Sequence, residues 1–252
     1  MLKIRVIPSL LIKNRGLVKT ERFKNGRYVG DPINAIKIFN DKEADELVVL
    51  DILATRTKSI DFSFISRINK EAFMPLGYGG GIRTVDEVSR IIGLGYEKVI
   101  LNNYALENPR LIDQAAAQCG SQSVVICIDV KKDWLGKYKV YRHSIQKNSN
   151  IDVVQWAQEA ADRGAGEIIL YNVDRDGTFS GYDINLLSLV SKKIKIPLVA
   201  LGGAGSIEDF KLAIHEGNAS AVAAGSIFVF HGPHRAVLIT YPQKDVLRKV
   251  LG

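Results

Sequence analysis

Three aspartates occupy positions where a carboxylate could transfer protons. Asp129 follows the apolar run Val124–Ile128, and Asp51 and Asp174 lie at the ends of two other apolar runs. A carboxylate at the end of a buried strand can act as a general acid or base if burial raises its pKa toward the working pH. The alternative is that the carboxylate only orders a loop by hydrogen bonding, and for Asp51 and Asp174 the two interpretations stay open.

Glycine-rich segments end several of the same apolar runs and could bind anions. A backbone without side chains lets N–H groups approach a phosphate closely. These segments form two similar groups. The first consists of Gly80, Gly81, Asn102 and Asn103, and the second of Gly202, Gly203, Gly225 and Ser226. The alternative is that the glycines serve tight turns alone. Because the pattern occurs twice, we predict two phosphate cups, and two cups on opposite sides would suit a ligand with a phosphate at each end.

A third set of side chains combines two bases and two acids. Each residue stands just before an apolar run, and the four are Arg5, Glu46, Lys98 and Glu167. If the runs are parallel strands of a barrel, these side chains would ring its N-terminal mouth. From the residues alone, a neutralised plug layer and a gate into an axial channel both remain open.

The elements that would position these groups alternate regularly along the chain. Eight apolar runs read as strands: Ile4–Leu10, Leu47–Ile52, Pro75–Tyr78, Val99–Leu101, Val124–Ile128, Ile168–Val173, Pro197–Leu201 and Ala221–Ala224. Helical patterns lie between them, for example at Asp31–Lys42, Val85–Gly93, Asp152–Arg163 and Ile207–Glu216. Continuous apolar strands alternating with helices favour a parallel sheet covered by helices. At 252 residues the prediction is a single (β/α)8 barrel domain over residues 1–252, with Val49 facing its axis.

An internal repeat supports this barrel. Glu46–Asp51 resembles Glu167–Asn172, Gly80–Glu87 resembles Gly203–Asp209, and the segment from Val6 resembles that from Val124, each about 120 residues apart. The chain therefore reads as a four-unit half used twice. The repeat also exposes an asymmetry, because the position that mirrors Asp129 holds Leu11, which cannot transfer a proton.

Composition excludes several classes of function. The formal charge is +7, but the basic residues are scattered and are not striped with aromatic ones, so nucleic-acid binding is not expected. No apolar run approaches membrane-spanning length, no secretory signal is evident, and two cysteines make no disulfide framework, so a cytoplasmic protein is expected. His231 and His234 flank Gly-Pro without a third ligand, and we expect no metal and no cofactor.

Several stretches together resemble the HisF family, the cyclase subunits of imidazole glycerol phosphate synthase. The resemblance runs along nearly the whole chain and rests on 45–51, 79–82, 107–109, 120–125, 163–167, 174–178, 180–183 and 202–205. It implies a barrel docked on a HisH-like glutaminase at its N-terminal face, with ammonia passing through the barrel. It favours the gate interpretation of the four charged residues. It makes Asp129 one of two catalytic aspartates and Lys19 a substrate-side lysine, and places Asp176, Gly177 and Thr178 at a phosphorylated ligand.

Departures from the family pattern point to a particular branch. Leu11 replaces the second catalytic aspartate, and Arg142, Tyr171 and Leu201 stand where the cyclase has small hydroxylated residues. The segment 228–242 resembles HisF-like proteins of acetamidino-sugar biosynthesis, which implies ammonia delivery for amidine formation on a nucleotide-linked sugar, with an N-acetyl-sugar amidotransferase as a further partner. The alternatives are a true cyclase of histidine biosynthesis and a non-catalytic scaffold that activates the glutaminase.

Overall fold

Eight parallel strands close into a barrel in the computed structural model, which describes residues 4–252. The strands are β1 (Arg5–Lys13), β4 (Leu47–Asp51), β5 (Leu76–Gly79), β6 (Lys98–Leu101), β7 (Val124–Lys132), β10 (Glu167–Asn172), β11 (Leu198–Leu201) and β12 (Ala221–Ala224). Neighbours pair in chain order, β12 pairs with β1, and β7 pairs with β10. The predicted (β/α)8 barrel is confirmed.

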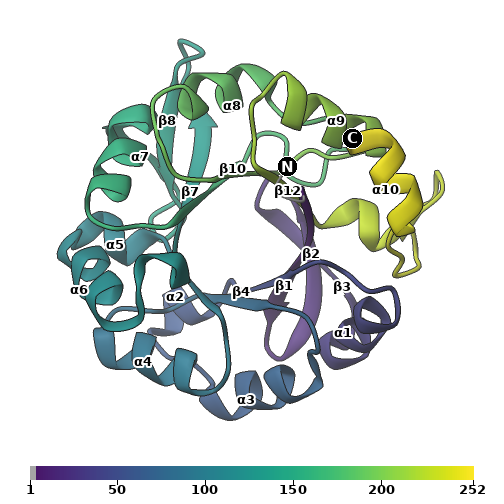
Figure 1. Cartoon of the computed structure of the whole chain (residues 1–252), viewed down its shortest axis with the longest axis horizontal. Coiled ribbons are helices and arrows are strands. Elements are labelled where there is room, and N and C mark those ends of the chain that lie inside the picture. Colours follow the sequence, from purple (N-terminus) through teal and green to yellow (C-terminus); the bar gives the residue numbers. More distant parts are fainter. Residues whose placement is uncertain (1–3) are drawn as a thin grey trace.

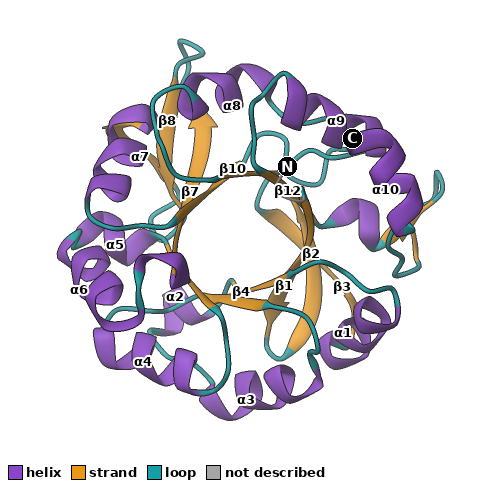
Figure 2. Cartoon of the chain, viewed as in Figure 1, coloured by secondary structure: helices purple, strands orange, loops and turns teal. Residues whose placement is uncertain are grey.

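Helices form the outer ring, as Figure 1 shows in a view along the barrel. They are α1 (Pro32–Asp41), α2 (Ala54–Thr57), α3 (Phe62–Glu71), α4 (Val85–Gly93), α5 (Asn103–Glu107), α6 (Arg110–Cys119), α7 (Val153–Asp162), α8 (Ile184–Ser191), α9 (Ile207–His215) and α10 (Lys244–Leu251). Short 3₁₀ turns lie at Ser121–Ser123 and Ser226–Phe228. Figure 2 separates the inner strands from this helical layer.

Two hairpin arms extend from equivalent strands of the two halves. The first is β2 (Gly16–Glu21) with β3 (Lys24–Gly30), which pairs with β1. The second is β8 (Tyr138–Arg142) with β9 (Lys147–Asp152), which pairs with β7. These arms were not predicted, because their strands are short and only partly apolar. A small two-stranded sheet, β13 (Phe230–His231) with β14 (Ala236–Val237), lies apart from the barrel.

The repeat extends to the way helices begin. Thr84 and Glu87 form a reciprocal capping box at α4, and Ser206 and Asp209 form the same box at α9. In each box one side chain satisfies the free N–H groups of the first helical turn while the acid bonds back to the cap. Equivalent local chemistry therefore starts equivalent helices in both halves.

Alternate residues of each strand separate an outer core from the barrel interior. Val49 packs in the outer core between strands and helices, whereas Val48 packs in the interior with Ile7 and Ile169. The prediction that Val49 faces the axis is therefore wrong. The cause is that a strand buried on both faces is apolar at every position, so its hydrophobic pattern does not reveal which face points inward.

Candidate functional site

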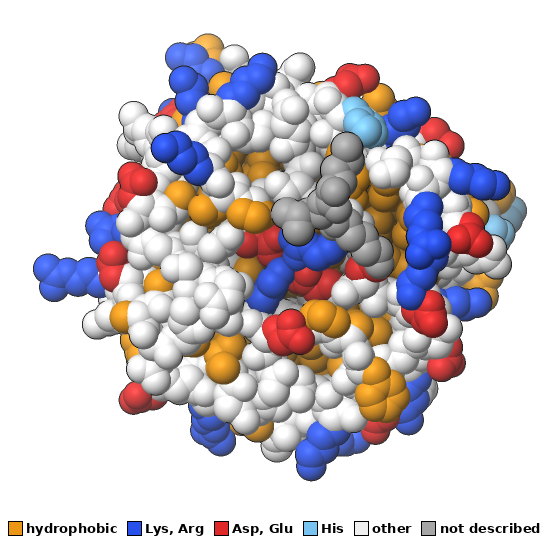
Figure 3. Space-filling view, in the orientation of Figure 1, with side chains coloured by type: hydrophobic (Ala, Val, Ile, Leu, Met, Phe, Trp, Pro, Cys, Tyr) orange, Lys and Arg blue, Asp and Glu red, His pale blue; other side chains and the backbone are white. Residues whose placement is uncertain are grey.

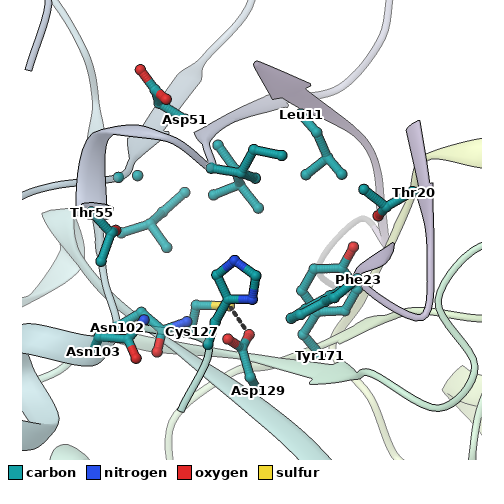
Figure 4. Close-up of a pocket in the computed structure, with 16 residues that line it drawn as sticks. Leu11, Thr20, Phe23, Asp51, Thr55, Asn102, Asn103, Cys127, Asp129 and Tyr171 are labelled. Atoms are coloured by element: carbon teal, nitrogen blue, oxygen red, sulfur yellow. Dashed lines mark hydrogen bonds between the residues drawn. The ribbon is translucent and has the colours of Figure 1, made fainter. Parts of the chain in front are cut away.

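A cavity of about 110 Å³ opens at the C-terminal mouth of the barrel, and we call it the chamber. Its walls come from strand ends, from the first hairpin arm and from the turn of the second. They include Leu11, Thr20, Phe23, Leu50, Asp51, Thr55, Gly80, Ile100, Asn102, Asn103, Cys127, Asp129, His143 and Tyr171. Figure 4 shows this arrangement, with Leu11 and Asp129 on different sides of the chamber.

Asp129 is the buried acid of the chamber. It is only 4% exposed, Cys127 Sγ lies 3.8 Å from its Oδ1, and Asn102 also hydrogen-bonds the carboxylate. Loss of hydration raises the Asp129 pKa to about 7, although the two hydrogen bonds oppose the shift. A carboxyl group with this pKa can give or accept a proton near neutrality, which is the chemistry that a general acid or base requires.

Leu11 brings no such chemistry to the chamber. The structure places Leu11 and Asp129 on β1 and β7, strands that begin the two halves, and both side chains line the same cavity. Leu11 is 4% exposed and apolar. The mirror position of the acid therefore presents only a hydrocarbon surface, while the catalytic role of Asp129 stays a prediction.

Tyr171 divides the barrel mouth. Its hydroxyl donates to Asp176 Oδ1 at 2.8 Å, and its ring meets that of Phe23 edge-on at 4.7 Å between centroids. Thr20 Oγ1 donates to the other oxygen of Asp176, also at 2.8 Å. Tyr171 lines both the chamber and a second cavity beyond it, so its ring forms the wall between the two.

A cavity lies at each of the two predicted cups, and the two cavities differ greatly in size. The first cup, lined by Gly80, Gly81, Asn102 and Asn103 together with Lys58 and Arg83, is a cavity of about 310 Å³. The second cup, lined by Asp176, Gly177, Gly202, Gly203, Gly225 and Ser226 together with Lys19, is a cavity of about 20 Å³.

Thr178 and two of the glycines qualify this picture. Thr178 does not line the second cup. Its hydroxyl donates instead to the carbonyl oxygen of Arg175 at 2.8 Å. Gly80 has a φ of 125° and Gly203 one of 114°, conformations that favour glycine whether or not an anion binds. The glycines alone therefore do not test phosphate binding.

Lys19 is buried inside the second cup. Its ammonium donates to the carbonyl oxygen of Ser9 at 2.6 Å, and a Cβ placed on Gly225 would lie 2.2 Å from Lys19 Nζ. Burial lowers the Lys19 pKa to about 8, although the nearby Asp176 carboxylate opposes the shift. The ammonium group of Lys19 thus occupies the space between the glycine backbones.

The four charged residues at the opposite mouth join into one ring. Lys98 Nζ bonds Glu46 Oε1 at 2.8 Å and Glu167 Oε2 at 2.7 Å, and Arg5 bonds the same two glutamates. Burial disfavours the Arg5 charge, but the two carboxylates outweigh it and raise the Arg5 pKa. Figure 3 shows acidic and basic side chains gathered at the centre of this face.

His143 is the chamber residue that sequence reasoning missed. It lies in the turn between β8 and β9, and its Nδ1 is buried without a hydrogen-bond partner in the described residues. Phe23 meets the imidazole edge-on at 5.5 Å between ring centroids, and burial together with the Arg56 charge lowers the His143 pKa. Nothing in the sequence pattern identifies it, because its position depends on how the unpredicted arm folds back.

Other candidate residues have structural tasks. Asp51 Oδ1 accepts from the backbone N–H groups of Leu53 and Ala54, and its side chain points away from the chamber in Figure 4. Asp174 accepts from Lys132 N at 2.9 Å. Both interactions favour the loop-ordering interpretation. Arg142, one of the departures from the family pattern, forms an ion pair with Glu107.

A match to the family described as histidine biosynthesis protein covers residues 5–234. Relatives named HisF align with nearly the full length of the chain. This chain belongs to the HisF family. A relative from Leptospira interrogans, provisionally named an imidazole glycerol phosphate synthase subunit HisF, is 47% identical over 97% of both chains. A provisionally named HisF subunit of Vibrio vulnificus is 46% identical, covering 100% of this chain and 97% of the relative. The imidazole glycerol phosphate synthase subunit HisF of Alkaliphilus metalliredigens is 41% identical over 92% of each chain.

The described residues offer neither a membrane-spanning helix nor a metal-binding cluster. No helix within residues 4–252 is long and apolar enough to cross a membrane. The same range contains no group of three or more His, Cys, Asp or Glu side chains placed to hold a metal ion.

Proposed function

We propose that this chain is a HisF-type subunit that receives ammonia from a HisH-like glutaminase and conducts it along the barrel axis. The observation that carries the proposal is the order of groups along that axis. A ring of paired charges lies at one mouth, an apolar interior that includes Ile7, Val48 and Ile169 follows, and Asp129 lies at the other mouth. Neutral ammonia can cross such an interior, whereas ammonium would lose its hydration without compensation.

The charged ring suits a gate because both cations contact both carboxylates. Arg5 and Lys98 each bridge Glu46 and Glu167, so passage of a molecule along the axis requires these contacts to rearrange. The ring lies at the N-terminal mouth, which is where the proposed glutaminase would dock. A partner that supplies or withdraws a contact there could couple glutamine binding to opening.

For the acceptor, we propose an acetamido group on a nucleotide-linked sugar, converted to an amidine together with an N-acetyl-sugar amidotransferase. Three side chains support an acceptor different from that of the cyclase. Leu11 removes one half of an acid–base pair, and Tyr171 and Leu201 fill space at the mouth. General acid–base help is worth roughly 10² to 10⁴ in rate, so its loss is a large change for the original reaction.

The second candidate acceptor is the cyclase's ribulosyl substrate, in histidine biosynthesis. It is supported by the names of the relatives, since the Alkaliphilus protein is called an imidazole glycerol phosphate synthase subunit. In that case another chamber group must serve in place of Leu11. A scaffold that only activates the glutaminase is the third candidate.

A blocked channel separates conduction from scaffolding. Val48→Trp places an indole in the barrel interior, and Leu189→Trp on the exposed surface of α8 is the matched control. We expect Val48→Trp to abolish glutamine-dependent product formation by the complex, glutamate release to continue, and free ammonium to restore the product. Recovery with ammonium also shows that the variant is folded. Unchanged glutamine-dependent product formation would refute conduction and favour the scaffold.

The acceptor is tested with free ammonium and each substrate in turn. If the chain converts the ribulosyl substrate to imidazole glycerol phosphate at ordinary enzyme rates, the amidine proposal is wrong. We expect negligible conversion by the native chain, and the variant Leu11→Asp shows whether a second carboxylate restores the reaction. Amidine formation with a nucleotide-linked acetamido sugar, its amidotransferase and the glutaminase is the positive result.

A further inference from the structure

Two large apolar side chains are exposed on the turn between β7 and β8, and we call this turn, residues 133–137, the tip. Trp134 is 89% exposed and Leu135 is 58% exposed. Trp134 makes no ring contact or side-chain hydrogen bond with any residue in the range 4–252. Figure 1 shows the tip beside the label β8, beyond the ring of helices. Burial of both side chains against another surface would be favourable.

The backbone of the tip is ordered by its own hydrogen bonds. Asp133 Oδ1 accepts from the backbone N–H groups of Leu135 and Lys137, both at 2.9 Å. The Tyr138 hydroxyl, directly after the tip, donates to Asp183 Oδ1 at 2.9 Å and so fixes the start of β8 to the barrel. An aromatic side chain on a preformed turn loses little conformational entropy when it binds. The indole is thus presented in the way that suits an anchor residue of an interface.

The equivalent turn of the first half lacks these apolar residues. It joins β1 to β2 and consists of Asn14 and Arg15. Arg15 Nη2 lies 2.6 Å from Asp61 Oδ2, so this turn is held against the barrel by an ion pair. Because the same kind of hairpin closes there with two polar residues, the fold does not require Trp134 and Leu135 at the tip.

Positive charge surrounds the exposed indole. The segment 131–139 contains a single acid, Asp133, and four lysines that form no ion pair within the described residues, namely Lys131, Lys132, Lys137 and Lys139. Lys131 Nζ lies 5.4 Å from the ring centroid of Tyr141. Lys132 Nζ lies 5.0 Å from that of Tyr138. Figure 3 shows basic side chains gathered at this corner of the molecule. A complementary surface must therefore be acidic around an apolar pocket.

One strand joins the tip to the chamber. β8 runs from the tip to the turn that places His143 in the chamber wall. A partner that binds the tip and lies along the arm therefore reaches the mouth from which conducted ammonia would emerge. We propose that the tip is the docking point of the enzyme that holds the ammonia acceptor, through a surface that combines an apolar pocket for Trp134 with acidic side chains for the lysines. This inference rests on the proposed function, because it gives the proposed amidotransferase a binding surface.

A protein surface fits these features better than a lipid surface. Lys131 pairs in register with Lys139, but its ammonium group lies over Tyr141, on the chamber side of that position. A flat membrane would touch only the outermost residues of the tip, whereas a concave protein surface can contact the indole and the charges along the arm together. Protein interfaces concentrate their binding energy in such aromatic residues and use the surrounding charges to steer association.

Binding of the purified amidotransferase to the immobilised chain, measured by surface plasmon resonance, tests the inference. Trp134→Ser should weaken the affinity at least about 30-fold, as expected for an anchor residue. The control is Phe73→Ser, which removes an 87% exposed aromatic side chain from the loop between α3 and β5 at the opposite end of the barrel. Its affinity for the amidotransferase should equal that of the native chain. Both variants should unfold at the native urea concentration, since neither side chain is buried.

Charge reversal tests the lysines separately. Lys132→Glu combined with Lys137→Glu should slow association with the amidotransferase by about 10-fold at low ionic strength, and the difference should shrink as salt is added. The matched control is Lys192→Glu combined with Lys193→Glu, two exposed lysines after α8 at the opposite end of the barrel. This control should leave the association rate unchanged.

The outcomes separate this inference from the proposed function. Equal affinities of Trp134→Ser and the native chain would overturn the docking point and leave the acceptor proposal standing. Failure of the native chain to bind the amidotransferase would overturn both, while the blocked-channel experiment still decides on conduction. Two other occupants are tested by sedimentation with vesicles of phosphatidylserine and phosphatidylcholine and by analytical ultracentrifugation of the chain alone. Vesicle binding or dimerisation that depends on Trp134, with no effect of Trp134→Ser on amidotransferase binding, would likewise refute the inference.

Discussion

Replacing Asp129 by asparagine should stabilise the protein, and increasingly so as the pH rises. The carboxyl group is buried and its pKa is raised from 3.8 to about 7. A group whose pKa is higher in the folded state contributes its stability at low pH and loses that contribution as the pH rises through the folded pKa. Asparagine keeps a similar shape without this titration.

The size of the effect follows from the pKa difference. Each unit is worth about 1.4 kcal/mol, so between pH 5 and pH 7 the native chain should lose roughly 2 kcal/mol relative to Asp129→Asn. Well above pH 7, where Asp129 is ionised in both states, the two curves should run parallel with respect to this group. Other carboxylates and histidines titrate alike in both chains and cancel in the difference.

Urea denaturation followed by circular dichroism at several pH values between 5 and 8.5 measures this difference. Asp41→Asn, an exposed carboxylate at the end of α1, is the control and should show a constant offset. If the free energies of unfolding of Asp129→Asn and the native chain also differ by a constant amount, the Asp129 pKa is not raised. Asp129 would then lack the pKa that a proton-transfer group in the chamber requires.

Three further outcomes follow from the same geometry. His143→Gln should lower product formation by roughly 100-fold while glutamate release stays constant, if the unpartnered imidazole takes over the base role that Leu11 lacks, whereas the exposed His215→Gln should change neither rate. Lys98→Met should lower the free energy of unfolding in urea by about 3–5 kcal/mol, because it removes one cation from two buried carboxylates. Burial depresses the Lys19 pKa to about 8, so the folded state resists protonation of this lysine. As the pH falls from 10.5 to 8, the free energy of unfolding of Lys19→Met should therefore rise by roughly 3 kcal/mol relative to that of the native chain in the same urea assay.

Much of the barrel could be predicted from the sequence because its signals are local. Apolar runs, helix starts and the repeat each depend on residues close together in the chain, and Val85–Gly93 is a helix with those bounds. The hairpin arms could not be predicted, because they are half-exposed strands that are stabilised by pairing with the extended ends of β1 and β7. The inward or outward direction of Val48 and Val49 depends on closure of the barrel and so lies outside local sequence.

The same distinction between local and long-range signals applies to the residues of the candidate site. Asp129 and the glycine cups were predictable because they end strands, and strand ends of a barrel meet at one rim. His143 and the closing of the second cup by Lys19 depend on side chains that reach across from arms folded back over the mouth. The repeat predicts two equal cups, but it carries no information on which of them the chain fills with its own lysine.

The contact between Phe23 and His143 joins the turns of the two equivalent arms. Residues related by a two-fold repeat that touch one another must lie near the axis of that repeat, as in the self-complementary interface of a symmetric dimer. If two identical halves once assembled this way, the turns of their two arms met at this point. In a single chain that constraint is absent, so the two turns can carry different side chains, a phenylalanine in one and an imidazole in the other. A position of former symmetry is thereby a place where a duplicated barrel can acquire chemistry that neither half possessed.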